Sequence, residues 1–172
     1  MAKITGGDKF RRDLKTLEKE TRGGVVRALE VASLEMVNEA DQRIPVDQGQ
    51  VRQQTGFRVD RDALKGFLYS NAPHAPFVEF GTGSKVKVPA ELQELAAQFK
   101  GKKSGSFQDL LINIQGWCKR KGIDAKAAYP IAMSIAKKGI SGHGFMYAGL
   151  QKGKSVFTKQ ISLLVKSVSI RK

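Results

Sequence analysis

Few residues of this 172-residue chain have the types and spacing that catalysis or metal binding requires. The two histidines, His74 and His143, lie in turns rich in proline or glycine, without a second histidine, a cysteine or a carboxylate at ligand spacing. The one cysteine, Cys118, has no disulfide partner and falls on the apolar stripe of an expected helix, where we expect a small core residue rather than a reactive thiol. We therefore predict that the protein is not an enzyme and holds no metal or cofactor.

The segment GLQKGKS, residues 149–155, comes close to a phosphate-binding loop but lacks its spacing. Such a loop has four residues between its first glycine and the Gly-Lys-Ser, so that successive backbone N–H groups can curl around the phosphates. Here three residues separate them, and no strand is expected before the segment. Nucleotide binding by this segment is therefore not predicted.

One acid has an unusual setting. Glu79 lies in the segment NAPHAPFVEFGTGS, residues 71–84, with Val78 and Phe80 on either side. We expect a strand from Phe77 to Phe80, and the prolines before it favour the edge of a sheet because proline cannot donate a ladder hydrogen bond. In such a strand, Phe77 and Glu79 would point to one face and their neighbours to the other. The glycines that follow permit either a tight turn or the close approach of another backbone.

The elements that would position these residues begin with a long helix and a hairpin. Apolar residues at three- and four-residue steps predict one helix over residues 9–43, or two helices joined at Gly23-Gly24. Pro45 ends this helix, because the residue before a proline is pushed out of the helical region. Alternating polar and apolar residues at 55–60, and a second run from Gly66, predict a β-hairpin.

The second half of the chain predicts helices separated by loops. We expect a helix within residues 90–99 and an amphipathic helix over 107–118 that Ser106 caps. A further helical segment extends from Asp124 to Lys138, interrupted or restarted at a proline. The last helix carries an apolar face formed by Phe157, Ile161, Leu164, Val165 and Val168.

Charge is distributed unevenly along the chain. The net charge is +14, yet residues 1–86 hold 14 Lys or Arg against 12 Asp or Glu, whereas residues 87–172 hold 16 against 4. From Ala125 onward there are nine basic residues and no acid. An excess of this kind attracts polyanions or acidic protein surfaces. No apolar run is long enough for a membrane span or resembles a signal peptide, so we expect a protein that stays in a cytoplasm.

A basic nucleic-acid-binding protein is one function that this charge permits. Residues 106–138 predict two helices with a glycine between them and basic residues at 119–121 and 137–138, as in a helix-turn-helix. A recognition helix, however, offers Arg, Asn or Gln to base edges. The second helix, AKAAYPIAMSIAKK, offers alanines, a proline and terminal lysines, so sequence-specific reading of DNA is not favoured.

Two segments taken together resemble the neck and tail-completion proteins of long-tailed bacteriophages. IPVDQGQVRQQTGFRV, residues 44–59, is similar to the family's Pro-Val-Asp-x-Gly turn and following strand, and VEFGTG within residues 71–84 is similar to its Val-Glu-Phe-Gly-Thr element. GHGFMYAGL, residues 142–150, resembles the segment that opens the family's C-terminal helix, with Gly144 where proline is usual. The resemblance covers about residues 22–84 and 130–168.

The resemblance implies a fold and a role. The fold would be α+β in one domain: an N-terminal helix packed on a small antiparallel sheet (about 9–83), a helical insertion (about 84–129) and a C-terminal helical part (about 130–170). The role would be that of a structural ring subunit that joins the capsid connector to the tail around the DNA channel. It implies a homo-oligomer next to connector and tail proteins, in the virion and in the host cytoplasm during assembly, with no membrane.

Within such a ring, Glu79 would lie at a subunit boundary, where it would need a charge-assisted partner such as an arginine of the same or the next subunit. An exposed acid that discourages edge-strand aggregation is the alternative. The candidate interface residues are Arg52, Arg58, Phe77, Glu79, Phe80, Gly81, Thr82 and Gly83. The residues expected to face an acidic partner or the DNA are Lys126, Lys137, Lys138, Lys152 and Lys154. We favour an acidic partner, because a DNA conduit works best with weakly binding walls.

Overall fold

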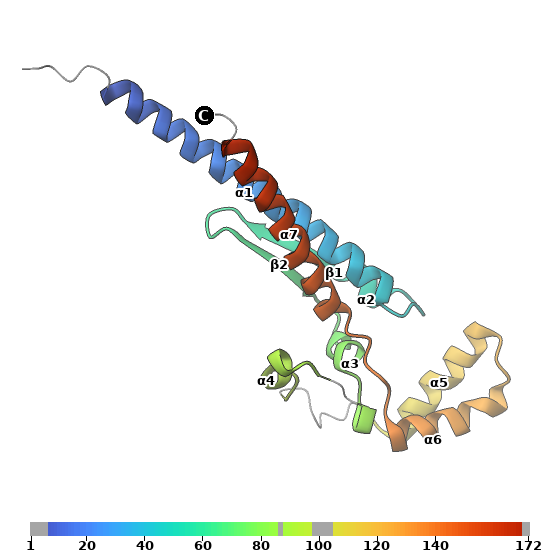
Figure 1. Cartoon of the computed structure of the whole chain (residues 1–172). Coiled ribbons are helices and arrows are strands. Elements are labelled where there is room, and N and C mark those ends of the chain that lie inside the picture. The colour runs from blue at the N-terminus through green and yellow to red at the C-terminus, as the bar shows by residue number, and fades with distance from the viewer. Residues whose placement is uncertain (1–6, 86–87, 98–104, 170–172) are drawn as a thin grey trace, which may run out of the picture. The chain divides into compact units, whose positions relative to one another are not determined.

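The computed structural model describes residues 7–85, 88–97 and 105–169, which are mostly helical (Figure 1). The α-helices are α1 (Gly7–Arg43), α2 (Gln50–Gln53), α3 (Ala75–Phe80), α4 (Gln93–Ala97), α5 (Phe107–Lys121), α6 (Ala128–Lys138) and α7 (Phe145–Ser169). Short 3-10 helices are η1 (Gly83–Lys85), η2 (Ala90–Leu92) and η3 (Ala125–Ala127). Strands β1 (Thr55–Asp60) and β2 (Lys65–Ser70) form a two-stranded sheet, so the predicted α+β class is confirmed.

The chain divides into two compact units that interleave in sequence. The first unit comprises Met1–Glu39, Gly56–Tyr69 and Ala148–Lys172, and the second comprises Ala40–Thr55 and Ser70–Tyr147. The first unit thus holds most of α1, the hairpin and most of α7. The second holds α2 to α6 and the start of α7. That the whole chain is one domain stays a prediction.

In the first unit, α7 and the hairpin lie along α1 (Figure 1). The α1 helix is continuous through its paired glycines, which settles the choice between one helix and two. Its buried face carries small and apolar side chains, namely Ala28, Leu29, Ala32, Ser33 and Met36. Glycines allow the elements to approach closely: a Cβ at Gly24 would lie 2.5 Å from Leu164 Cδ1, and one at Gly153 would lie 2.3 Å from Met36 Cγ. The two contacts show that α7 runs antiparallel to α1.

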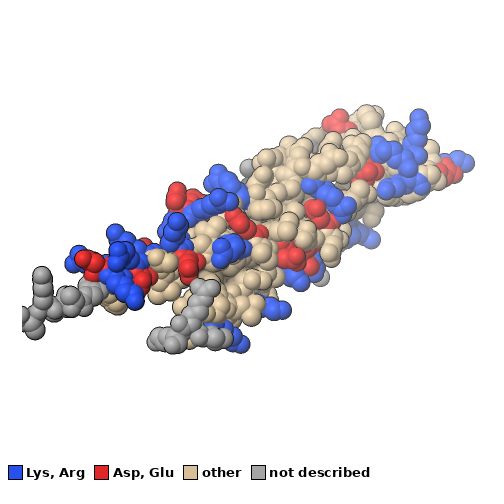
Figure 2. Space-filling view, turned by 90° about the horizontal axis from the view of Figure 1, so that it is seen from above, with Lys and Arg blue, Asp and Glu red and all other residues tan. Residues whose placement is uncertain are grey.

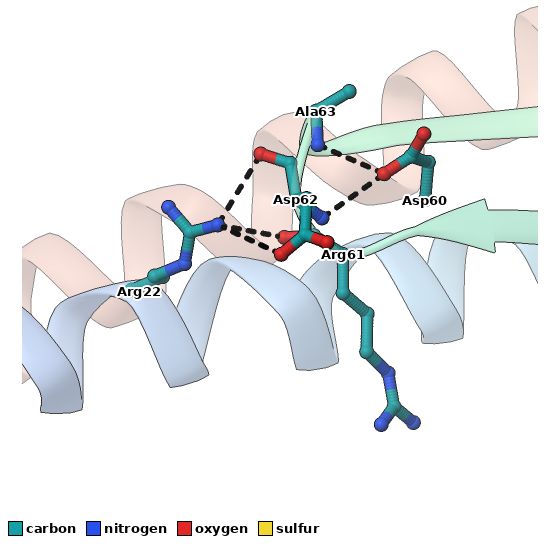
Figure 3. A network of polar contacts seen from close by, with 5 residues as sticks. All are labelled: Arg22, Asp60, Arg61, Asp62 and Ala63. Carbon is teal, nitrogen blue, oxygen red and sulfur yellow. Dashed lines mark hydrogen bonds and ion pairs between the residues drawn. The ribbon is translucent and has the colours of Figure 1, made fainter.

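The tip of the hairpin is fastened to α1 by Arg22 (Figure 3) and by an ion pair of Arg61 with Glu30 at 2.9 Å. Arg22 donates hydrogen bonds to the carbonyl oxygens of Arg61 (3.1 Å) and Asp62 (3.2 Å), and its guanidinium lies 3.6 Å from the Asp62 carboxylate. Asp60 accepts hydrogen bonds from the N–H groups of Asp62 and Ala63. These bonds lower the pKa of Asp60, and the bond from Ala63 has the larger effect. Because the tip is held in this way, the hairpin has a fixed direction on α1.

One face of α7 differs from the prediction. Phe157, Ile161, Leu164 and Val168 of the predicted apolar face are partly buried, but Val165 is 58% exposed. The reason is geometric: at 100° of rotation per residue, Val165 lies at the edge of this face, 100° from Leu164.

In the second unit, the segment expected to be a strand is a helix. Residues Phe77 to Phe80 belong to α3, which has proline in its first turn, and the prediction of a strand there was wrong. A run of four residues, three of them apolar, fits a strand and a buried helix equally well. Proline decides the matter, because its fixed φ suits the first helical turn, where the N–H it lacks has no partner to lose.

The helices of the predicted insertion form as expected where they are described. Ser106 and Asp109 make a reciprocal capping box at the start of α5, with Ser106 N–H donating to Asp109 Oδ2 at 2.8 Å. The α5 and α6 helices pack together, and the Phe107 and Tyr129 rings meet edge to face at 6.0 Å. Cys118 is fully buried, as predicted. Among residues 7–85, 88–97 and 105–169, no helix is both long and apolar enough to cross a membrane.

The paired glycines of α1 give a matched test of the first unit. Gly24→Ala should lower the free energy of unfolding by about 1–3 kcal/mol, because its methyl group would overlap Leu164. Gly23→Ala should raise it by about 0.5–1 kcal/mol, because alanine favours the helix and its Cβ would meet only Arg27 Nη1 at 3.7 Å. Urea denaturation of both variants measures the difference, and equal stabilities would contradict this packing.

Candidate functional site

The carboxylate of Glu79 binds the amino end of α7. Glu79 Oε2 accepts a hydrogen bond from the Met146 N–H at 2.7 Å, and Oε1 accepts one from the Tyr147 N–H at 3.0 Å. The first N–H groups of a helix have no partner within it, and the helix dipole favours a negative charge there. Glu79 is 5% exposed, so this contact lies inside the second unit. Phe145, the first residue of α7, directly precedes Met146 and is fully buried.

Two opposing effects set the pKa of Glu79. Burial raises the pKa above its usual value of 4.5, because the charged form loses its hydration. Hydrogen bonds from the N–H groups of Met146, Tyr147 and Phe145 oppose this shift by stabilising the carboxylate, but burial is the larger effect. Both Glu79 oxygens thus accept hydrogen bonds from the same chain, which argues for a structural rather than a catalytic carboxylate.

The backbone around Glu79 is joined to the segment before α7. The Thr82 N–H donates to the Ile140 carbonyl at 2.8 Å, and the Ile140 N–H donates to Thr82 Oγ1 at 2.9 Å. The carbonyls of Val78 and Glu79 accept from the N–H groups of residues 143 (2.8 Å) and 144 (3.0 Å). An antiparallel bridge joins Gly81 to Ser141. We call these paired segments, residues 78–82 and 140–147, the clamp.

Glycines in the clamp are required by the closeness of the two backbones. A Cβ at Gly142 would lie 2.4 Å from the Glu79 carbonyl oxygen and 2.5 Å from the Phe80 carbonyl carbon. A Cβ at Gly81, whose φ is +83°, would lie 2.5 Å from Gly142 N and from the Ile140 oxygen. The sequence left open whether these glycines permit a tight turn or the close approach of another backbone. Gly81 permits the close approach of another backbone.

The turn motif PVDQG has a separate contact in the second unit. The Asp47 carboxylate accepts hydrogen bonds from Arg120 Nε (3.2 Å) and Nη2 (2.5 Å), at the last turn of α5. The bond from Arg120 lowers the pKa of Asp47 below its usual range. Gly49 follows with a φ of +76°, a left-handed conformation that glycine adopts without strain. The turn therefore anchors the end of α5.

The predicted interface residues have contacts within their own units. Phe77 and Phe80 belong to α3, and Phe80 is 7% exposed, while Gly81 and Thr82 belong to the clamp and Gly83 begins η1. Arg52, on α2, donates to the Asp41 carbonyl. Arg58, on β1, lies with its guanidinium 5.4 Å from the centre of the Phe67 ring. The clamp residues that the prediction missed are Val78, Ile140, Ser141, Gly142, His143, Gly144, Phe145, Met146 and Tyr147.

The five predicted partner-facing lysines are all exposed. Lys126, Lys137 and Lys138 lie on η3 and at the end of α6, in the second unit, and Lys152 and Lys154 lie on α7 in the first unit. On the face that Figure 2 displays, basic and acidic side chains are interspersed with uncharged surface. Their role stays a prediction.

A cavity of about 360 Å³ adjoins the clamp. It is lined by Glu79, Phe80, Val88, Pro89, Gly142, His143, Gly144 and Tyr147. Glu79 contributes to its wall but is committed to the α7 amino end. In the part of the chain that the structure describes, no three His, Cys, Asp or Glu side chains gather as metal ligands would.

The chain is similar to a known protein family over part of its length. Residues 8–81 match the family model "HK97-gp10-like: Bacteriophage HK97-gp10, putative tail-component". The matched segment runs from α1 through the hairpin and α3 to Gly81 in the clamp, and it confirms the resemblance to a tailed-phage family over these residues. It supports a structural role of the tail-component kind, which implies contacts with other phage structural proteins and a place in the virion. No curated protein and no solved structure matches the chain.

The raised pKa of Glu79 predicts a pH-dependent stability. Between pH 4.5 and the raised pKa, the folded chain holds a proton that the unfolded chain has released, so the free energy of unfolding falls as the pH rises through this window. Glu79→Gln lacks this component. Gln also offers one acceptor oxygen instead of two, so one α7 N–H loses its partner and stability falls by about 1–3 kcal/mol.

Denaturation of the wild type and Glu79→Gln across this pH range measures both effects. Glu91→Gln, which changes an exposed acid on η2, should keep the wild-type profile. Parallel profiles for the wild type and Glu79→Gln would rule out a titrating Glu79.

The glycine at the centre of the clamp gives a second test. Gly142→Ala should lower the free energy of unfolding by about 3 kcal/mol, because the atoms that its methyl group meets are backbone atoms, which cannot rotate away. Ser141→Ala is the matched control, since it keeps the backbone and changes an exposed side chain of a bridge residue. Thermal denaturation compares the two, and an unchanged melting temperature for Gly142→Ala would show that the backbones are farther apart.

Proposed function

We propose that this protein is a non-enzymatic structural subunit of a tailed bacteriophage, a neck or tail-completion protein that forms a ring at the head–tail junction. The observation that carries the proposal is the match of residues 8–81 to a phage tail component. The ring would join the capsid connector to the tail and would surround the DNA channel. Its neighbours would be connector and tail proteins.

The contacts of Glu79 support a structural role for the most unusual acid in the sequence. A catalytic acid or base needs a free position for the proton it transfers, in reach of a substrate. Both Glu79 oxygens instead accept hydrogen bonds from the backbone of α7. The clamp thus fixes the backbone of residues 78–82 against that of residues 140–147. A fixed conformation suits a subunit of a large assembly.

Exposed apolar side chains support assembly. Monomeric proteins seldom expose contiguous apolar patches, and larger ones mark sites of association. On α1, Phe10, Leu14 and Leu17 are 64%, 48% and 44% exposed, respectively. They recur on one helix face, so they form a stripe rather than isolated contacts with water.

The basic residues of the second half would face acidic surfaces of neighbouring ring proteins. Every residue from Ala125 onward that carries a charge is Lys or Arg. The exposed lysines concerned are Lys126, Lys137, Lys138, Lys152 and Lys154. A lumen that bound DNA tightly would hinder its passage, so the DNA would pass without specific binding.

A basic nucleic-acid-binding protein is the alternative function. The pairing of α5 with α6, followed by Lys137 and Lys138 in the last turn of α6, favours it. Binding of this kind would be strong at low salt, would weaken steeply as salt rises and would ignore sequence.

Solution mass and DNA affinity together separate the two functions. We expect native mass spectrometry and negative-stain images to show closed rings, because a ring subunit assembles with copies of itself. In 0.15 M salt, where charges more than about 8 Å apart are screened, the assembled ring should bind a DNA duplex little better than a neutral protein does. A stable monomer that binds DNA tightly, with a steep salt dependence, would replace the proposed function by the alternative.

A further inference from the structure

The amino-terminal part of α1 presents an apolar stripe to solvent. All side chains of residues 8–20 are exposed, and Phe10, Leu14 and Leu17 share one face at four- and three-residue steps. The same spacing continues to Thr21, Gly24 and Ala28, where the face becomes buried, and Gly24 is in close contact with Leu164 of α7. The stripe therefore continues the face of α1 that α7 covers only from Gly24 onward.

A groove between α1 and α7 lies in the same unit. Its volume is about 760 Å³, and its lining residues are Lys15, Thr16, Lys19, Glu20, Gly23, Arg27, Leu164, Ser167 and Val168. Leu164 and Val168 supply apolar surface. The volume is within the range of protein pockets that enclose a ligand, about 300–1,000 Å³.

Gly23, in the groove, has no packing reason of its own. A glycine inside a helix costs about 0.5–1 kcal/mol relative to alanine. Gly24 offsets this cost through its contact with Leu164, but a Cβ at Gly23 would meet only the Arg27 side chain, at 3.7 Å. Since the described first unit leaves the space above Gly23 open, a side chain from another molecule can enter there.

The charges that border the stripe and the groove are opposite. The stripe is bordered by Arg11 and by two acids, Asp13 and Glu18, at the positions next to it on the helix. The groove has three cations, Lys15, Lys19 and Arg27, and one acid, Glu20. Opposite charges around two apolar surfaces give specificity and faster association.

We propose that the stripe of one copy docks in the groove of a second copy, with an apolar side chain of the stripe above Gly23. This inference rests on the proposed assembly of identical subunits. At 100° per residue, the stripe and the groove lie on different sides of α1. Each copy therefore offers both surfaces to different neighbours. Such a head-to-tail contact closes into a ring or grows into a filament, whereas contact between two like surfaces stops at a dimer.

Two variants separate the surfaces. Leu14→Lys places a cation in the stripe, which would face the cations of the groove, and Gly23→Leu fills the groove with a side chain that suits a helix. Each variant alone should lose the assembled species at concentrations at which the wild type is fully assembled, as measured by light scattering after size exclusion. Two controls should still assemble: Leu34→Lys, which changes another exposed leucine of α1, and Gly23→Ala, which leaves room in the groove.

Mixing the two variants tests the direction of the contact. Leu14→Lys keeps an intact groove and Gly23→Leu keeps an intact stripe, so an equimolar mixture should form a one-to-one heterodimer that grows no further. Wild-type assembly should weaken as the salt concentration rises from about 0.05 M to about 0.5 M, because salt screens the charges at the contact. Circular dichroism melting verifies that both variants fold.

The outcomes also distinguish this contact from the proposed function. If both variants form wild-type rings in negative-stain images, the docking is wrong and the ring stands. If the mixture forms no heterodimer although each variant folds, the head-to-tail pairing is wrong. A wild type that stays monomeric at every concentration would overturn both.

Discussion

The amino end of α7 depends on one buried carboxylate. A helix begins with N–H groups that lack partners, and a buried acid needs donors, so each would be costly alone. Glu79 meets both needs by accepting from Met146 and Tyr147. The paired backbones of the clamp follow from this contact, because the glycines at 81 and 142 let residues 78–82 and 140–144 come together around it. The position at which α7 begins is thereby fixed.

Local patterns predicted most of the elements. Three- and four-residue steps gave α1, α5 and α7, a serine before an apolar run gave the cap of α5, and alternation gave the hairpin. The short helix α2 was not predicted, and α3 was predicted as a strand. The apolar run of α3 is too short for its period to show, and a proline that weakens a strand strengthens the first turn of a helix. Pattern length, rather than composition, limited the prediction there.

The site could be predicted only in part. The sequence marked Glu79 and the glycines after it, and it marked the segment that opens α7, but no local pattern pairs residues 67 positions apart. Arg52 and Arg58 were the expected partners of Glu79, because a sequence shows which side chains carry a positive charge. The actual donors are backbone N–H groups, which every residue except proline possesses. Residue type therefore says little about such a partner.

The interleaving of the two units has a consequence for the order of synthesis. The first unit needs α1, which the ribosome makes early, and α7, which is made after all of the second unit. The buried face of α1 around Ala32 and Met36 must therefore wait for its covering while the intervening chain emerges. A nascent chain in this state exposes apolar surface, and such surface is bound by chaperones or leads to aggregation. The hairpin, made soon after α1 and tied to it by Arg22, gives that face an early partial cover.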